Sequence, residues 1–177
     1  MNCSQTLYQK VLGEEYQQLP KILQEFHARP QGGSAVGRIE VRHGKGVVRK
    51  MLARLLRLPS EGKDIPLRLQ VVVRDNQEEW VRYFGEQRLA TLQWDQQGYL
   101  VEKGGPLKLL FQLTADPAGM TFNIQKNRVG IISVPTWLMM RVHARATATD
   151  CGWKLSVAVA LPLFGVITAY SGTITPI

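Results

Sequence analysis

Hydrophobic and polar residues alternate along most of the chain after residue 60, which is the pattern of half-buried β-strands. Asp75-Asn76 ends one such run, and a turn at residues 116–119 separates two others. The clearest runs occupy residues 36–43, 67–74, 107–114, 120–124, 140–149 and 153–161, and weaker ones occupy residues 79–84, 88–94 and 99–103. Because turn signals recur at intervals of roughly 8–12 residues, we expect a mainly β (α+β) fold with a curved or barrel-like antiparallel sheet of about 8–9 strands.

The last 23 residues, 155–177, contain no charged side chain and are long enough in principle to cross a bilayer. Pro162, Gly165, Gly172 and Pro176 interrupt this stretch. Polar serine and threonine positions also fit strands better than a membrane helix. We therefore predict two strands around a turn at residues 162–165, and no membrane span.

Three helices are predicted. Two short ones, at residues 6–16 and 20–27, begin the chain, and a basic amphipathic one covers residues 47–58 and ends at Leu58-Pro59. On the third, one half of the helical wheel is apolar and the other carries Arg49, Lys50, Arg54 and Arg57. The leading interpretation is a lid over one side of the sheet, with Met51, Leu52, Leu55 and Leu56 facing inward. Alternatively, the same apolar face could contact a membrane surface or a protein partner.

Composition places the chain among globular proteins and localises its charge. A length of 177 residues, with 45% hydrophobic and 20% charged residues, fits one domain over residues 1–177. Residues 38–57 hold seven of the 22 basic residues and one acid, so the net charge of +8 is largely a local patch. That patch has no aromatic residue for base stacking, so nucleic acid is not expected to bind it. Without a signal-like N-terminus, and with Cys3 and Cys151 expected as free thiols, a cytoplasmic location is expected.

Catalytic and metal-binding motifs are not apparent. His27, His43 and His143 have no neighbours at metal-ligand spacing, so neither a metal nor a cofactor is expected. His27, which follows Phe26 at the end of a predicted helix, is the one candidate functional histidine. It could cap the helix end or act with a nearby carboxylate in an enzyme of unrecognised type. No catalytic residue is assigned, and a non-catalytic role is the leading expectation.

A row of small side chains suggests a cavity. In the run at residues 140–149, alternation places Ala144, Ala146 and Ala148 on the inward face, where they leave volume that larger residues would fill. Either a helix approaches there or a pocket opens. If a pocket opens, we expect its apolar walls to come from Phe122, Trp137, Ala144, Ala146 and Trp153. We expect a basic rim that binds an acidic head group to come from Lys45, Arg49 and Arg54.

Three functions remain open from the residues alone. The leading one is an accessory module that binds a hydrophobic or amphipathic small molecule in the sheet cavity. The alternatives are the enzyme that uses His27, and a module that contacts a membrane or a protein through the basic helix at residues 46–58.

The order of several short motifs resembles an uncharacterised bacterial domain-of-unknown-function family (family number 4166). The resemblance covers nearly the whole chain and rests on Leu7-Tyr8, Val11-Leu12-Gly13, Leu19-Pro20, Phe26-His27, Gly44-Lys45-Gly46, Leu58-Pro59, Trp80 with Arg82, Phe84-Gly85, Gly105-Pro106-Leu107, Pro135, Leu161-Pro162-Leu163-Phe164-Gly165, Tyr170 and Gly172.

The resemblance implies an accessory role but carries no catalytic residues. Such domains are found alone or fused to saccharopine-dehydrogenase-like or epimerase-like NAD(P)-binding domains. This chain has no glycine fingerprint for NAD(P), so an NAD(P)-dependent partner enzyme is expected to be a separate protein.

Overall fold

The computed structural model describes residues 5–55, 58–130, 132–135, 137 and 139–177. The expectations about Cys3, Leu56, Arg57 and the Leu55 side chain fall outside what the structure describes. Cys151 is an exposed free thiol, as the sequence predicts.

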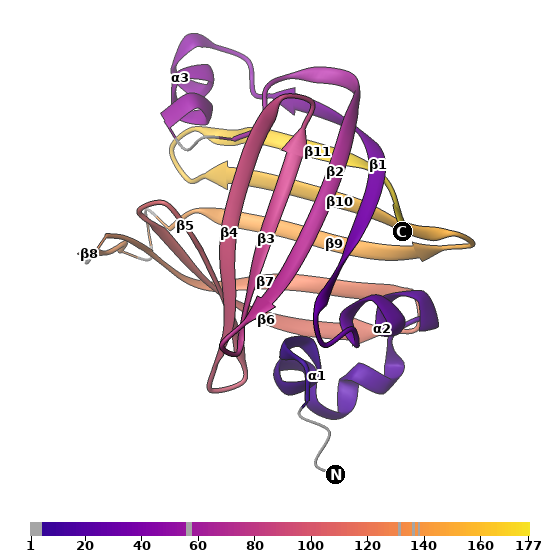
Figure 1. The fold of residues 1–177 in the computed structure, drawn as a ribbon. Coiled ribbons are helices and arrows are strands. Elements are labelled where there is room, and N and C mark those ends of the chain that lie inside the picture. The colour runs from indigo at the N-terminus through magenta and orange to yellow at the C-terminus, as the bar shows by residue number, and fades with distance from the viewer. Residues whose placement is uncertain (1–4, 56–57, 131, 136, 138) are drawn as a thin grey trace.

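Ten antiparallel strands close into a barrel in the described part of the chain (Figure 1). Each strand pairs with its sequence neighbour, except where β7 pairs with β9 and where β11 returns to β1 to close the ring. A short additional strand, β8, extends from β7. The strands are β1 (Gly32–His43), β2 (Gly62–Arg74), β3 (Gln77–Phe84), β4 (Gln87–Gln96), β5 (Tyr99–Gly104), β6 (Leu107–Asp116), β7 (Gly119–Val129), β8 (Ile132–Ser133), β9 (Arg141–Thr149), β10 (Gly152–Leu161) and β11 (Gly165–Pro176).

The N-terminal helices cover one end of this barrel. They are α1 (Leu7–Leu12), the 3₁₀ helix η1 (Gly13–Gln18) and α2 (Lys21–His27). Their apolar side chains, among them Tyr8, Leu23 and Phe26, are buried in the same core as the inward residues of the strands. The third helix, α3 (Val47–Leu55), lies toward the other end, against β1 and β11 (Figure 1).

Local irregularities let the strands coil tightly enough to close. Pairing shifts register between Ile39 and Val41 on β1, and again between Val159 and Ala160 on β10. Such bulges bend a strand and increase its twist. At Gly172 of β11, an added Cβ would collide with the carbonyl oxygen of Arg38, so this crossing requires glycine.

The predicted fold class is confirmed, with one correction of count. Ten strands close the barrel among the described residues, so about 8–9 strands was too low. Residues 155–177 form most of β10 and β11 around the turn, as predicted. No helix within the described ranges is both long and apolar enough to cross a membrane.

The predicted orientation of the basic helix is wrong. The Met51 side chain is 61% exposed and Val47 is 84% exposed, whereas Ala53 on the opposite side of α3 is fully buried. Leu52 is only half-buried. Arg49, which the wheel placed on the solvent side, donates from Nε to the Phe164 carbonyl in the β10–β11 turn. The helix therefore presents Arg49 and Ala53 to the barrel, and Val47, Val48 and Met51 to solvent.

Candidate functional site

A cavity of about 210 Å³ lies inside the barrel. An apolar cavity of about 150 Å³ is enough to hold a benzene-sized molecule, so this one has room for a small ligand. Most of its wall is apolar and comes from the inward positions of the strands. The lining residues include Leu67, Leu69, Phe84, Leu107, Leu109, Phe111, Met120, Phe122, Val142, Ala144, Ala146, Leu155, Val157 and Val159.

The alanines of β9 hollow out one wall. Ala146 lies between Met120 of β7 and Leu155 of β10. Ala144 lies between Phe122 of β7 and Val157 of β10 in the same way. Each alanine is thus a small residue between two larger ones, and the missing side-chain volume contributes to the cavity.

Aromatic rings close the cavity at the end covered by α1 and α2. The Tyr8 and His27 rings are packed with centroids 3.7 Å apart, and the Trp80 ring of β3 lies 5.9 Å from His27. Phe26 bridges to Trp153 of β10, with centroids 4.9 Å apart. These contacts join two helices to both sides of the barrel, so the helical cover is part of the core.

His27 is a neutral residue in this aromatic cluster. Burial lowers the pKa of its imidazole from 6.5 to about 3. A neutral ring cannot provide the positive charge that would favour the end of α2, so a charged helix cap is excluded at neutral pH. No ion pair or hydrogen bond joins His27 to a carboxylate within the described residues, and the catalytic pair of the enzyme alternative is not assembled here.

A buried polar cluster interrupts the apolar wall on β3, β4 and β5. Arg82 Nη1 donates to Thr91 Oγ1 (2.8 Å), and the Thr91 hydroxyl donates to Glu102 Oε1 (2.7 Å). Arg82 Nη2 also lies 3.2 Å from Glu102 Oε1, and both side chains are less than one-fifth exposed. The guanidinium group lies over the Trp80 ring, 5.2 Å from its centroid. We call Arg82, Thr91 and Glu102 the interior polar cluster.

Two tyrosines add hydroxyl groups to the lining. Tyr8 donates to Gln93 Oε1 (3.0 Å), and burial raises the pKa of its phenol well above 10. Tyr170 of β11 packs edge-on against Phe84, and burial raises the pKa of its phenol to about 12. Both phenols stay protonated at neutral pH. Within the described residues, the Tyr170 hydroxyl has no hydrogen-bond partner, so it can form a hydrogen bond with a ligand.

Another buried carboxyl lies at the helix-covered end. Glu78 of β3 accepts a hydrogen bond from Trp80 Nε1 (2.8 Å). Burial raises the pKa of this carboxyl, and the Trp80 hydrogen bond partly offsets that rise. Glu78 therefore serves to orient the Trp80 ring in the aromatic cluster. No group of three or more His, Cys, Asp or Glu side chains fit to hold a metal occurs in the part of the chain the structure describes.

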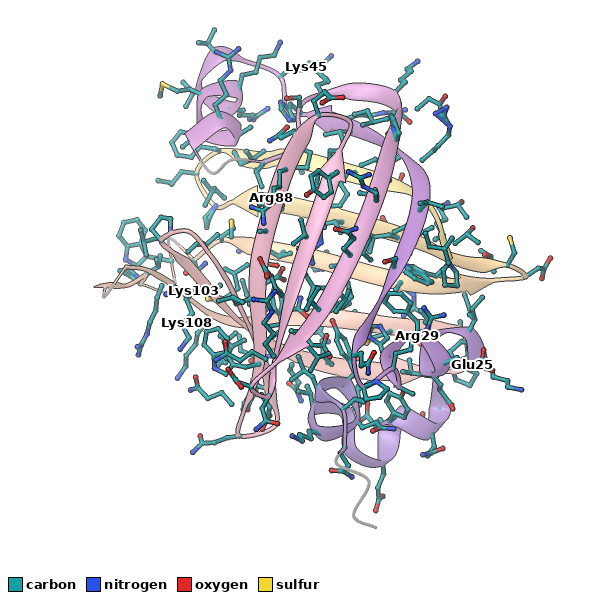
Figure 2. All side chains as sticks on the ribbon, in the orientation of Figure 1. Glu25, Arg29, Lys45, Arg88, Lys103 and Lys108 are labelled. Carbon is teal, nitrogen blue, oxygen red and sulfur yellow. The ribbon has the colours of Figure 1, made fainter. Side chains whose placement is uncertain are left out.

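Only some of the residues that the sequence suggested for a ligand site line the cavity. Phe122, Ala144, Ala146 and Trp153 line the cavity together. Trp137 lies outside it, with 68% of its surface exposed. The basic rim is not assembled either: Lys45, Arg49 and Arg54 do not line the cavity, and Lys45 and Arg54 are exposed. Figure 2 shows Lys45 beside α3, far from the helix-covered end where Glu25 and Arg29 lie.

Sequence reasoning missed the interior polar cluster. Arg82 stands between Trp80 and Phe84 at an inward position of its strand, which was the available signal. Charged residues normally occupy the outward positions of a half-buried strand, so the alternation alone does not distinguish a lining arginine from a solvated one. The partners Thr91 and Glu102 come from other strands, and only the register of β3, β4 and β5 brings them together.

One comparison with known proteins gives a match. The model of a family described as "Domain of unknown function (DUF4166)" matches residues 19–174, which is most of the chain. No curated protein matches the chain. No solved structure matches it either.

Proposed function

Because the chain belongs to the DUF4166 family, whose function is unknown, we propose from the site itself that the barrel binds one small amphipathic molecule. The observation that supports this most directly is the cavity of about 210 Å³, which has mostly apolar walls and a few buried polar groups, among them the interior polar cluster. Ligand sites typically combine predominantly apolar walls with a few convergent polar groups. In this proposal the protein binds its ligand without transforming it.

The interior polar cluster favours a ligand whose polar end is neutral. Arg82 and Glu102 already neutralise each other. An anionic head group would have to displace Glu102 from Arg82 and leave a buried carboxylate unpaired, at a substantial desolvation cost. A hydroxyl or carbonyl group could instead hydrogen-bond to the cluster or to the Tyr170 hydroxyl. We therefore favour a neutral polar end over the acidic head group expected from the sequence.

Matched eight-carbon ligands test this proposal. Isothermal titration calorimetry would compare 1-octanol, octanoate and 1-octylamine on the full-length protein. We expect 1-octanol to bind at least about tenfold more tightly than either charged ligand, since a charge cannot enter the neutralised cluster without desolvation. Native mass spectrometry of freshly purified protein would show whether a small molecule co-purifies.

A pair of alanine variants locates the binding. Ala146→Leu fills the cavity, and we expect it to weaken 1-octanol binding at least about tenfold. Ala158→Leu adds the same volume at a position of β10 outside the cavity lining, and we expect little change. Circular dichroism would establish that both variants fold. Equal affinities of the two folded variants, or no heat with 1-octanol at two temperatures about 15 °C apart, would contradict the proposal.

A further inference from the structure

Helix α3 turns an apolar face to solvent. Val47, Val48 and Met51 are 84%, 48% and 61% exposed. At about 100° per residue these three positions share one side of the helix, and the fully buried Ala53 lies on the other. Three exposed apolar side chains on one helix face are an unusual surface for a helix that has a barrel available to cover them.

A hydrogen bond from Arg49 to the barrel, the burial of Ala53 and contacts within the α3 segment fix this orientation. Besides its bond to the Phe164 carbonyl, Arg49 donates from Nη1 to the Lys45 carbonyl (3.1 Å). Ala53 is small enough to let the helix lie close to the barrel, and its carbonyl accepts from the Leu58 N–H (2.9 Å). The exposed face is therefore a consequence of specific contacts on the opposite side of α3.

Two more exposed apolar residues lie in the turn and strand against which α3 packs. Leu163, in the turn that holds Arg49, is 69% exposed, and Val166 at the start of β11 is 47% exposed. Gly44, just before α3, lies so close to β11 that an added Cβ would collide with the Val166 carbonyl. We call Val47, Val48 and Met51 the α3 apolar face.

Uncompensated positive charge surrounds this face. No acidic residue occurs between Glu40 and Glu61. Lys45, Lys50 and Arg54 are exposed, and none of them forms an ion pair with another residue in the described ranges. Lysine and arginine next to exposed apolar side chains complement the anionic head groups and acyl region of a lipid surface.

We propose that the α3 apolar face docks on an anionic lipid bilayer. Val47, Val48 and Met51 insert shallowly, while Lys50 and Arg54 contact lipid phosphates. Since the segment around α3 has no aromatic residue, base stacking by a nucleic acid offers no equivalent explanation. The inference is independent of the proposed function, because docking needs no ligand in the barrel.

Vesicle flotation with the full-length protein tests the docking. Two vesicle types are compared at low salt: phosphatidylcholine alone, and phosphatidylcholine with about 30% phosphatidylglycerol. We expect binding to the anionic vesicles to be at least about tenfold stronger, and to weaken sharply at high salt. No binding to anionic vesicles at low salt would overturn the proposal.

Two variants separate the contributions of charge and insertion. Lys50→Glu/Arg54→Glu reverses the charge beside the face, and Val47→Ser/Met51→Ser removes apolar surface at unchanged charge. We expect each to weaken anionic-vesicle binding at least about tenfold. The control Lys10→Glu/Lys154→Glu makes the same charge change at exposed positions on α1 and β10, and should bind within about twofold of the unmodified protein.

Three outcomes would reject the assignment. Equal losses in the α3 charge variant and the control would indicate general electrostatic attraction. Full binding by Val47→Ser/Met51→Ser would exclude insertion. A dimer seen by light scattering, and dissociated by that variant, would assign the face to a second copy of the chain. Thermal melting of each variant would show that it is folded.

Discussion

The two ends of the barrel carry amphipathic helices that face opposite ways. At one end, α1 and α2 point their apolar residues into the core, where Tyr8 and Leu23 are each only 1% exposed. Toward the other end, α3 keeps Ala53 against the barrel and exposes Val47 and Met51. The difference shows that an amphipathic pattern predicts an apolar face but not the surface that the face contacts.

The tertiary contacts at each end account for the difference. At the helix-covered end, the large inward rings of Trp80 and Trp153 pack against Tyr8, His27 and Phe26. At α3, the Phe164 carbonyl accepts a hydrogen bond from Arg49 and so holds the side of the helix that carries Arg49 and Ala53 against the barrel. One helix pair completes a core, and the other helix leaves an apolar surface available for a partner.

The largest expected contrast between the two ends is in folding stability. Leu23→Ala removes a buried side chain from the helix-covered end, and should lower the free energy of unfolding by about 2–5 kcal/mol. Met51→Ala removes exposed surface and should change it by less than about 0.5 kcal/mol. Urea denaturation would measure both. Similar losses in the two variants would mean that the α3 apolar face is packed in solution.

Acid should destabilise the helix-covered end specifically. The pKa of His27 is about 3 in the folded protein and 6.5 when the residue is solvated, so below pH 6.5 the unfolded chain binds the extra proton. The His27 contribution is fully present above pH 6.5 and is lost by about 1.4 kcal/mol per unit as pH falls toward 3. Between pH 8 and pH 5 this amounts to about 2 kcal/mol.

A single variant isolates that histidine. Burial raises the pKa of Glu78, so its protonation in acid favours the folded protein and opposes the effect of His27. Denaturation of the unmodified protein and of His27→Gln should therefore be compared at several pH values. We expect the acid-dependent loss to be about 2 kcal/mol smaller in His27→Gln than in the unmodified protein. An unchanged pH dependence in His27→Gln would show that this ring is hydrated rather than buried.

The smallest effect concerns the start of α1. The Gln9 side-chain oxygen accepts a hydrogen bond from the Thr6 N–H (2.8 Å), one half of a capping box. Gln9→Ala should therefore lower the free energy of unfolding by about 0.5–1 kcal/mol. Gln17→Ala, at an exposed position of η1, is the control and should have a smaller effect in thermal melts. No difference between them would mean that the cap does not hold α1 on the barrel.

Much of the fold could be predicted because strand alternation is a local property. The runs at residues 107–114 and 120–124 lie within β6 and β7, and the turn between them pairs Asp116 with Gly119. The candidate site was only partly predictable. Ala144 and Ala146 were identifiable because small residues on an inward face are visible in the sequence, whereas Lys45 and Arg54 were assigned to a rim only through the wrong orientation of α3.

Two expectations from the family resemblance stay predictions. These are the fusion of related domains to NAD(P)-binding domains and the existence of an NAD(P)-dependent partner enzyme. Neither expectation rests on the residues that line the barrel interior. The proposed ligand and the α3 apolar face can therefore be tested without them.

The sequence by itself determined most of the strands and the turns between them, where helices form, and the concentration of positive charge at residues 38–57. Each of these follows from residues close together in the chain, through periodicity and turn chemistry. Only the tertiary structure decided that the sheet closes, that Arg82, Thr91 and Glu102 meet inside it, and that α3 faces outward. Those features depend on strand register and on contacts between distant segments, which local pattern does not encode.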